Sequence, residues 1–241
     1  MGDRAEIIGE GRRRIFRSAA AAMLALLAAP AAAQYGVPPP QNVPDAPSRS
    51  ADSEAAPATQ ADLLRAASCL AGRDARAGEA LLATAPYSQP ERQEAVRALR
   101  AAERCLRRRG GLATSPLMLR GAMAEALYES RFPQPPEPRD PPAAPAPLLG
   151  AEAAAEHSEV APAFALADCT AARQPALVRD LLAAEPASAA ETAAQQALGP
   201  VFSQCVTAGT SLNIDRASLR AILAESLYRW STAQGGPPPS P

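Results

Sequence analysis

Residues 119–130 read LRGAMAEALYES, and residues 219–230 read LRAILAESLYRW. The second stretch begins 100 residues after the first (219 − 119 = 100), and both place the same Leu, Arg, Ala, Glu, Leu and Tyr in the same order. Leucine or methionine recurs at every fourth position in each stretch, which predicts one apolar face of a helix. Ser115 and Asp215 stand just before these patterns and are favourable N-caps.

The same offset aligns the flanking sequence without a gap. The matched residues other than alanine and leucine include Cys69 and Cys169, Cys105 and Cys205, Pro86 and Pro186, Ser88 and Ser188, and Glu91 and Glu191. Chance matches among alanines do not explain pairs of this kind. We therefore interpret residues 60–131 and 161–231 as two copies of one helical unit, produced by an internal duplication.

The composition favours an all-α fold. The apolar residues are mostly Ala and Leu, which form helices well, and aromatic residues make up only 4% of the chain. In the first copy we expect helices over 61–72 and 75–85, a third beginning at Ser88, and a fourth beginning at Ser115. Ser88 and Glu91 have the spacing of a capping box, as do Ser188 and Glu191 in the second copy.

The four cysteines predict two disulfides, Cys69–Cys105 and Cys169–Cys205, because each pair then lies within one copy at the same separation. Closing a loop of this size contributes about 4 kcal/mol in the chain-entropy description. The alternative is a metal site built from all four cysteines, but none of the pairs has the close spacing of common zinc motifs. The fold expected is thus two tandem disulfide-stapled four-helix units joined by a Pro-rich linker.

The N-terminal residues 1–33 have the pattern of a secretory signal peptide. A basic segment at 12–17 precedes an apolar segment of Ala and Leu, which ends at Ala31-Ala32-Ala33. We expect cleavage after Ala33 and a periplasmic or secreted location, although a retained N-terminal anchor helix is the alternative. The run of arginines fits a twin-arginine signal in part, so the general secretory and twin-arginine routes both stay open.

Three further segments lack an apolar period and are rich in Pro, Ala or Ser. They are a leader at 34–59, a linker at 132–160 and a tail at 232–241. This composition is typical of disordered or semi-extended chain.

Motifs for catalysis and cofactor binding are missing from the sequence. The one histidine, His157, falls in the linker, which leaves no base for a Ser-His-Asp or Cys-His arrangement. The glycines do not form a phosphate-binding loop, and no ligand spacing for zinc or calcium is present. A net charge of −1 gives no positive electrostatic field that would attract nucleic acid. We therefore expect no cofactor, no metal and no nucleic-acid partner.

Six matched residues on the fourth helices are candidates for contacts between the copies: Arg120, Glu125, Tyr128, Arg220, Glu225 and Tyr228. Two carboxylates in one cleft can serve as acid and base. The simpler interpretation is that each glutamate forms an exposed ion pair with arginine or faces water. The tyrosines are expected at the edge of the core, each with its ring packed and its hydroxyl in water.

These features favour a non-enzymatic exported protein that binds or scaffolds in the cell envelope, with an unknown protein or envelope component as partner. One alternative is a cell-envelope hydrolase that uses Glu125 and Glu225. Another is a carrier with an apolar cavity of a few hundred cubic ångströms between alanine-rich helices. The sequence leaves open whether the two copies pack into one bundle.

Overall fold

The structure is a computed structural model that describes residues 59–106, 112–138, 146–207, 209–210 and 212–235. All of these residues belong to one compact unit, Arg49–Pro241. The predicted signal peptide, the leader as far as residue 58 and the tail from residue 236 lie outside the described residues.

The elements of the described chain are all α-helices, which confirms the predicted fold class. They are α1 (Gln60–Arg73), α2 (Ala75–Leu82), α3 (Gln89–Leu106), α4 (Pro116–Arg131), α5 (Ala151–Glu156), α6 (Ala161–Arg173), α7 (Pro175–Ala183), α8 (Ala189–Cys205) and α9 (Arg216–Ala233). We call α1–α4 the N-terminal group and α6–α9 the C-terminal group.

The long helices begin at the polar residues that the sequence predicts. The hydroxyl of Ser115 accepts a hydrogen bond from the backbone N–H of Met118 at the start of α4. The carboxylate of Asp215 accepts one from the N–H of Ser218 at the start of α9. These contacts satisfy backbone donors that have no partner within the first turn of a helix.

The second helix of the N-terminal group is shorter than the predicted span of 75–85, and its counterpart α7 likewise ends before Pro186. Helix α2 ends at Leu82 and α7 ends at Ala183, because the next residues form the turn that leads into α3 or α8. In these turns Tyr87 and Ala187 adopt φ values of 65° and 62°. Residues other than glycine rarely occupy this left-handed region, so both turns are held by their surroundings.

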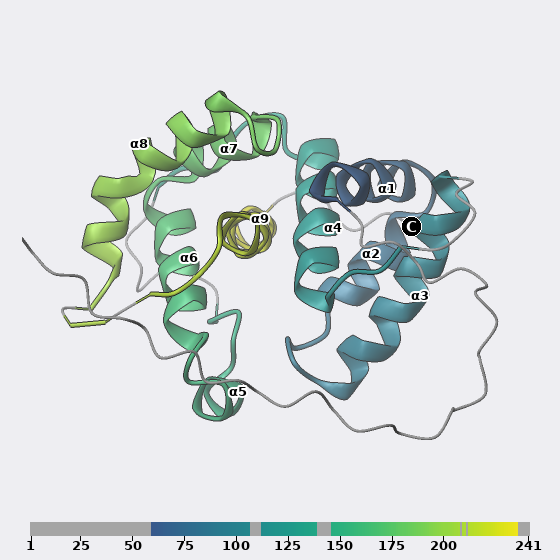
Figure 1. The fold of residues 1–241 in the computed structure, drawn as a ribbon, viewed down its shortest axis with the longest axis horizontal. Helices are drawn as coiled ribbons and strands as arrows, with labels where there is room; N and C mark the ends of the chain where they lie inside the picture. The colour runs from purple at the N-terminus through teal and green to yellow at the C-terminus, as the bar shows by residue number, and fades with distance from the viewer. Residues whose placement is uncertain (1–58, 107–111, 139–145, 208, 211, 236–241) are drawn as a thin grey trace, which may run out of the picture. The chain divides into compact units, whose positions relative to one another are not determined.

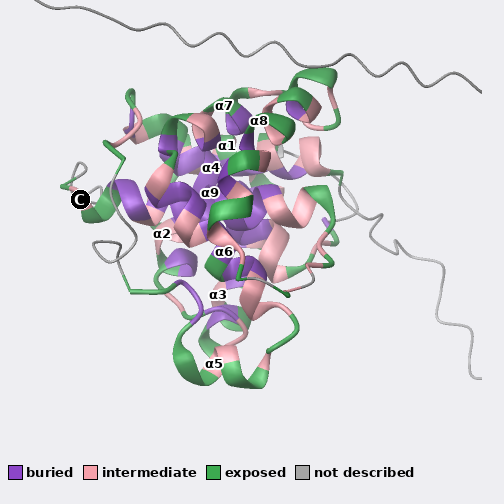
Figure 2. Ribbon diagram, turned by 90° about the vertical axis from the view of Figure 1, so that its left-hand side faces the viewer, coloured by how far each residue is buried: buried purple, intermediate pink, exposed green. Residues whose placement is uncertain are grey.

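Helices α4 and α9 lie at the centre of the compact unit and make the most extensive contact of any helix pair. In Figure 1, α4 lies in the plane of the picture while α9 is viewed along its axis, so the two helices cross. Helices α1, α2 and α3 contact α4, α6 and α7 contact α9, and α8 packs on α6 and α7. Figure 2 shows buried residues concentrated around α4 and α9.

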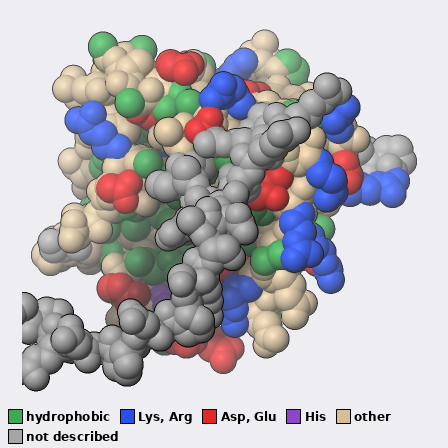
Figure 3. All heavy atoms as spheres, turned by 45° about the vertical axis from the view of Figure 1, so that its right-hand side comes forward, with side chains coloured by type: hydrophobic (Ala, Val, Ile, Leu, Met, Phe, Trp, Pro, Cys, Tyr) green, Lys and Arg blue, Asp and Glu red, His purple; other side chains and the backbone are tan. Residues whose placement is uncertain are grey.

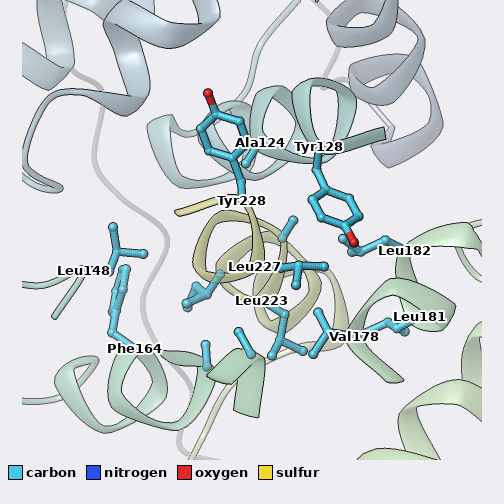
Figure 4. Packing of buried hydrophobic residues seen from close by; sticks show 14 of the residues in the cluster. Ala124, Tyr128, Leu148, Phe164, Val178, Leu181, Leu182, Leu223, Leu227 and Tyr228 are labelled. Atoms are coloured by element: carbon cyan, nitrogen blue, oxygen red, sulfur yellow. The ribbon is translucent and has the colours of Figure 1, made fainter. Parts of the chain in front are cut away.

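Two hydrophobic clusters form the core. One lies within the N-terminal group and draws on residues from Leu63 to Ala126. The other joins the groups, because it combines Ala124 and Tyr128 of α4 with Leu223 and other residues of α6, α7 and α9 (Figure 4). A shared core of this kind makes the two groups one packed body.

The described part of segment 132–160 differs from the expected linker, because it contains a helix and three buried residues. It contains helix α5, and the side chains of Phe132, Leu148 and Leu149 are buried in the shared core. These apolar residues interrupt the proline-rich composition, and their burial removes them from water.

The two predicted disulfides are confirmed. Cys69–Cys105 links α1 to α3, and Cys169–Cys205 links α6 to α8. The Cα atoms are 5.9 Å apart in the first pair and 5.7 Å in the second, at the usual separation for a disulfide. The four-cysteine metal site is therefore wrong, since every cysteine is bridged.

Candidate functional site

The repeated phrase lies where α4 and α9 cross. Residues 119–128 are buried throughout, as are residues 220–228, so all faces of these helices are covered. A Cβ atom added to Gly121 would lie only 2.3 Å from the Cβ of Ala221 and 2.4 Å from its Cα. The backbones approach closely at this point, and only glycine at position 121 permits it.

Two reciprocal ion pairs flank the crossing point. Arg120 of α4 donates two hydrogen bonds to Glu225 of α9, with Nε 2.9 Å from Oε2 and Nη2 bonded to Oε1. Arg220 of α9 donates in the same way to Glu125 of α4, at 3.0 Å and 2.6 Å. Each helix thus supplies one arginine, which binds the other helix, and one glutamate, which binds the arginine of the other helix. The contact between two identical subunits of a two-fold symmetric dimer has the same reciprocal form.

The same arginines cap the ends of the short helices. Arg120 donates to the carbonyl oxygens of Leu81 and Leu82 at the end of α2. Arg220 donates to those of Leu181 and Leu182 at the end of α7, at 3.1 Å and 2.7 Å. These carbonyls lack partners within their helices, and a cation at a helix C-terminus also interacts favourably with the helix dipole.

Two further glutamates complete the cluster. Glu191 lies 3.0 Å from Arg220, and Glu91 lies 3.5 Å from Arg120. Their other oxygens accept the backbone N–H groups of Ala187 and Tyr87, the two residues with positive φ. These hydrogen bonds explain how the strained turns are held. They also differ from the expected capping box, in which the glutamate accepts from the backbone N–H of the N-cap serine itself. Here each glutamate accepts from the N–H of the residue before that serine.

The resulting cluster holds more negative than positive groups. It contains four buried carboxylates and two guanidiniums, and none of these side chains is more than 5% exposed. Burial raises the pKa of the Glu125 carboxyl above its ordinary value of 4.5, although Arg220 opposes the rise. Burial also raises the pKa of Glu91, against the charge of Arg120. The protein therefore favours the neutral form of these two acids more than water does.

This geometry corrects the expectation of exposed ion pairs. The sequence shows that Arg120, Glu125, Arg220 and Glu225 are matched, but not that another helix covers them. Glu125 and Glu225 are each held in a guanidinium fork, and neither side chain is more than 5% exposed. Sequence reasoning read Glu91 and Glu191 only as capping residues, although their exact match at the 100-residue offset was a signal of this further role.

The two matched tyrosines differ in their surroundings. Tyr228 accepts a hydrogen bond from Arg131, which also pairs with Glu79. Tyr128 is only 1% exposed, and within the described part of the chain its hydroxyl has no hydrogen-bond partner. In Figure 4 its hydroxyl points toward Leu182. The expected wet hydroxyl is therefore wrong for Tyr128.

An open groove of about 490 Å³ lies beside α5 and α6. It is lined by Pro147, Leu149, Ala151, Ala154, Ser158, Ala161, Pro162, Phe164, Ala165, Asp168, Thr207 and Thr210. The wall is mainly apolar, and the volume falls in the range of small-molecule sites. Sequence reasoning missed this groove because its walls combine helix α6 with residues of the expected linker and of the segment after α8.

His157 lies next to Ser158, a residue of the groove wall. It stacks on Tyr87 with ring centroids 4.2 Å apart, and its Nδ1 lies 3.8 Å from Glu159. Figure 3 shows hydrophobic side chains gathered next to this histidine.

No group of three or more His, Cys, Asp or Glu residues capable of holding a metal occurs among the described residues. The described helices also include none with the length and apolar character to cross a bilayer.

Comparison of the chain with protein-family models, with curated protein sequences and with solved structures finds no match. Functional conclusions therefore rest on the geometry of this chain.

Proposed function

We propose that this is an exported, non-enzymatic binding protein of the bacterial cell envelope, which takes an apolar ligand in the groove beside α5 and α6. The groove is the observation that carries the proposal. It combines a volume of about 490 Å³ with walls made mostly of Ala, Pro, Leu and Phe. The proposal combines the binding protein that the sequence favours with the small-ligand carrier that it leaves as an alternative.

The polar cluster at the helix crossing supports a structural role for the matched residues. Both arginines and four glutamates bind one another or backbone groups at the crossing. Hydrogen bonding and burial at this level hold side chains in one geometry and keep water away. We infer that the matched residues form an interface between two helical units, and that the apolar ligand binds elsewhere, in the groove beside α5 and α6.

Internal duplication of one helical unit is part of the same proposal. Supporting it, contacts recur at an offset of 100 residues: Arg120–Glu225 and Arg220–Glu125, the disulfides, the Ser88 and Ser188 caps, and the turns at Tyr87 and Ala187.

Binding to the groove is tested with the fluorescent apolar probe 1-anilinonaphthalene-8-sulfonate on the full chain. We expect saturable binding at one site, weakened at least about tenfold (about 1.4 kcal/mol) by Ala165→Phe, which places a ring in the groove. The control is Ala80→Phe, which adds the same ring at an exposed position of α2. Binding that does not saturate, or that both variants reduce equally, would contradict the proposal.

Export is tested separately by fractionating the native host and sequencing the N-terminus of the protein. We expect the envelope or secreted fraction to contain a chain that begins at Gln34. A chain that keeps Met1 and stays in the cytoplasm would show that the export proposal is wrong.

A further inference from the structure

The C-terminal group binds a non-helical segment of its own chain. The backbone N–H of Leu148 donates to Asp168 at 2.8 Å, and Arg229 donates to the carbonyl oxygen of Ala146 at 2.8 Å. Ser226 holds the second oxygen of Asp168 at 2.7 Å. Figure 4 shows Leu148 lying next to Phe164. Segment 146–149 is thus held by backbone contacts together with the burial of leucine.

A cavity of about 150 Å³ occupies the corresponding place beside α4. It is lined by Leu64, Ser68, Glu125, Ala126, Glu129, Leu182, Ala183, Ala184, Glu185, Pro186 and Arg220. Four of these residues stand 100 positions before residues that hold or contact segment 146–149, namely Phe164, Asp168, Ser226 and Arg229. Among the described residues, segment 146–149 thus fills this place on one side of the helix crossing, and none of them fills it on the other side.

The open cavity differs from its counterpart in charge. Glu129 stands where the other side has Arg229, Ser68 replaces Asp168, and Glu185 corresponds to Ala85. Glu129 and Glu185 are exposed at the rim, whereas Arg220 in the wall already binds Glu125 and Glu191. The rim is therefore acidic, which favours a cationic occupant.

The size of the cavity limits what it can hold. Sites for drug-sized ligands begin at about 300 Å³, twice this volume. A volume of about 150 Å³ is that of about five water molecules, so it accommodates one long side chain rather than a whole small molecule.

We propose that this cavity is a docking site for a non-helical peptide segment of a partner protein that inserts one arginine or lysine side chain. The segment lies as residues 146–149 lie on the other side, with backbone groups near Ser68 and Glu129. Its basic side chain pairs with the carboxylates of Glu129 and Glu185. This site shares no lining residue with the apolar groove, so it is a separate function of the molecule.

The test uses the full chain and a fluorescein-labelled peptide, Ac-APLRG-amide, whose sequence follows residues 146–150 with arginine in place of the second leucine. The comparison peptide is Ac-APLEG-amide. Binding is followed by fluorescence anisotropy at low ionic strength, because salt weakens pairs at a rim. We expect the arginine peptide to bind at least about tenfold more tightly than the glutamate peptide.

Variants of the chain locate the site. Glu129→Arg introduces the residue found at the equivalent position of the other side, and it should weaken binding of the arginine peptide at least about tenfold. Glu185→Ala should weaken it less. The control Glu152→Arg makes the same charge change at an exposed position of α5, and it should leave binding within about twofold.

Three results would overturn the proposal. They are equal binding of the two peptides, binding that Glu129→Arg leaves unchanged, and equal losses in Glu129→Arg and Glu152→Arg. Sedimentation gives a further check: a dimer that Glu129→Arg converts to monomer, without peptide binding, would assign the cavity to a second copy of the chain. If one of these results is found and the variant Glu129→Arg still binds the apolar probe normally, the docking proposal has failed and the groove proposal has not.

Discussion

At the scale of single residues, the arginines of the repeated phrase have the most demanding environment. Each is about 1% exposed and binds two carboxylates and the carbonyls of a helix end. A buried ion pair is weak evidence of net stability, because removing its charges from water costs about as much as their attraction returns. The fork geometry of arginine does specify which helices meet and in what register.

Because carboxylates outnumber guanidiniums in the cluster, arginine and glutamate substitutions should differ in cost. Arg220→Gln leaves Glu125 and Glu191 buried without a cation and should lower the free energy of unfolding by about 3–5 kcal/mol. Glu125→Gln leaves Arg220 paired with Glu191 and should cost less than about 2 kcal/mol. Urea denaturation measures both.

The matched control is Glu94→Gln, which removes a more exposed pair with Arg97 within α3. It should change the free energy of unfolding by at most about 0.5 kcal/mol. A larger loss in Glu125→Gln than in Arg220→Gln would contradict the charge balance described here.

The raised pKa of Glu125 gives stability a defined pH dependence. At a pH between the ordinary pKa of 4.5 and the raised pKa of the folded state, the Glu125 carboxyl keeps its proton in the folded protein and releases it in the unfolded chain. The stabilising contribution is therefore complete below pH 4.5 and is lost as pH rises through the folded pKa. The charged groups acting on Glu125 are Arg220, Glu129 and Glu191.

Urea denaturation of the protein and of Glu125→Gln, at steps from about pH 4 to pH 8, isolates this contribution. The free energy of unfolding of the protein minus that of the variant should decrease as pH rises. An increase with pH would mean that Arg220 outweighs burial and that the pKa of Glu125 is lowered.

At the scale of elements, the contact between α4 and α9 depends on one small residue at the crossing. Helix contacts improve when backbones come close, and glycine alone allows the approach seen at residue 121. Glycine in the middle of a helix otherwise lowers its stability by about 1 kcal/mol relative to alanine. Its presence in α4 thus reflects packing rather than helix formation.

Gly121→Ala should separate α4 from α9 and destabilise the protein. The added methyl group would overlap both the Cβ and the Cα of Ala221, and overpacking of this kind costs about 1–3 kcal/mol beyond any gain in helix propensity. Gly72→Ala in α1 is the control, because a Cβ there meets nothing within 4 Å and should be neutral or slightly stabilising. Equal effects in denaturation of the two variants would disprove the close approach.

At the scale of the whole compact unit, one core continues across both groups, and each group carries its own disulfide. A disulfide acts largely by limiting the unfolded chain, so its effect depends on the loop that it closes. Both loops here span 36 residues.

Replacing both cysteines of one bridge should therefore lower the free energy of unfolding by about 4 kcal/mol in either group. The pairs to compare are Cys69→Ala with Cys105→Ala, and Cys169→Ala with Cys205→Ala, each measured by urea denaturation. A loss below about 1 kcal/mol in either pair would show that the bridge does not constrain the unfolded chain as the entropy description requires.

The sequence by itself determined the all-α class, the N-caps at Ser115 and Asp215 and the pairing of the cysteines. Helix propensity and capping depend on residues a few positions apart, and the cysteine pairing followed from a repeat visible in the printed chain. It also identified the six matched residues, although it assigned their ion pairs to the surface.

Only the tertiary structure decided what those residues touch. The burial of the Arg–Glu exchange, the approach at Gly121, the packing of Leu148 and Leu149, the groove and the cavity all involve residues far apart in the chain. Local sequence carries no signal for such contacts, because burial is set by whichever helix comes to lie alongside. Within the described part of the chain, the same matched positions are consequently covered by segment 146–149 on one side and line a cavity on the other.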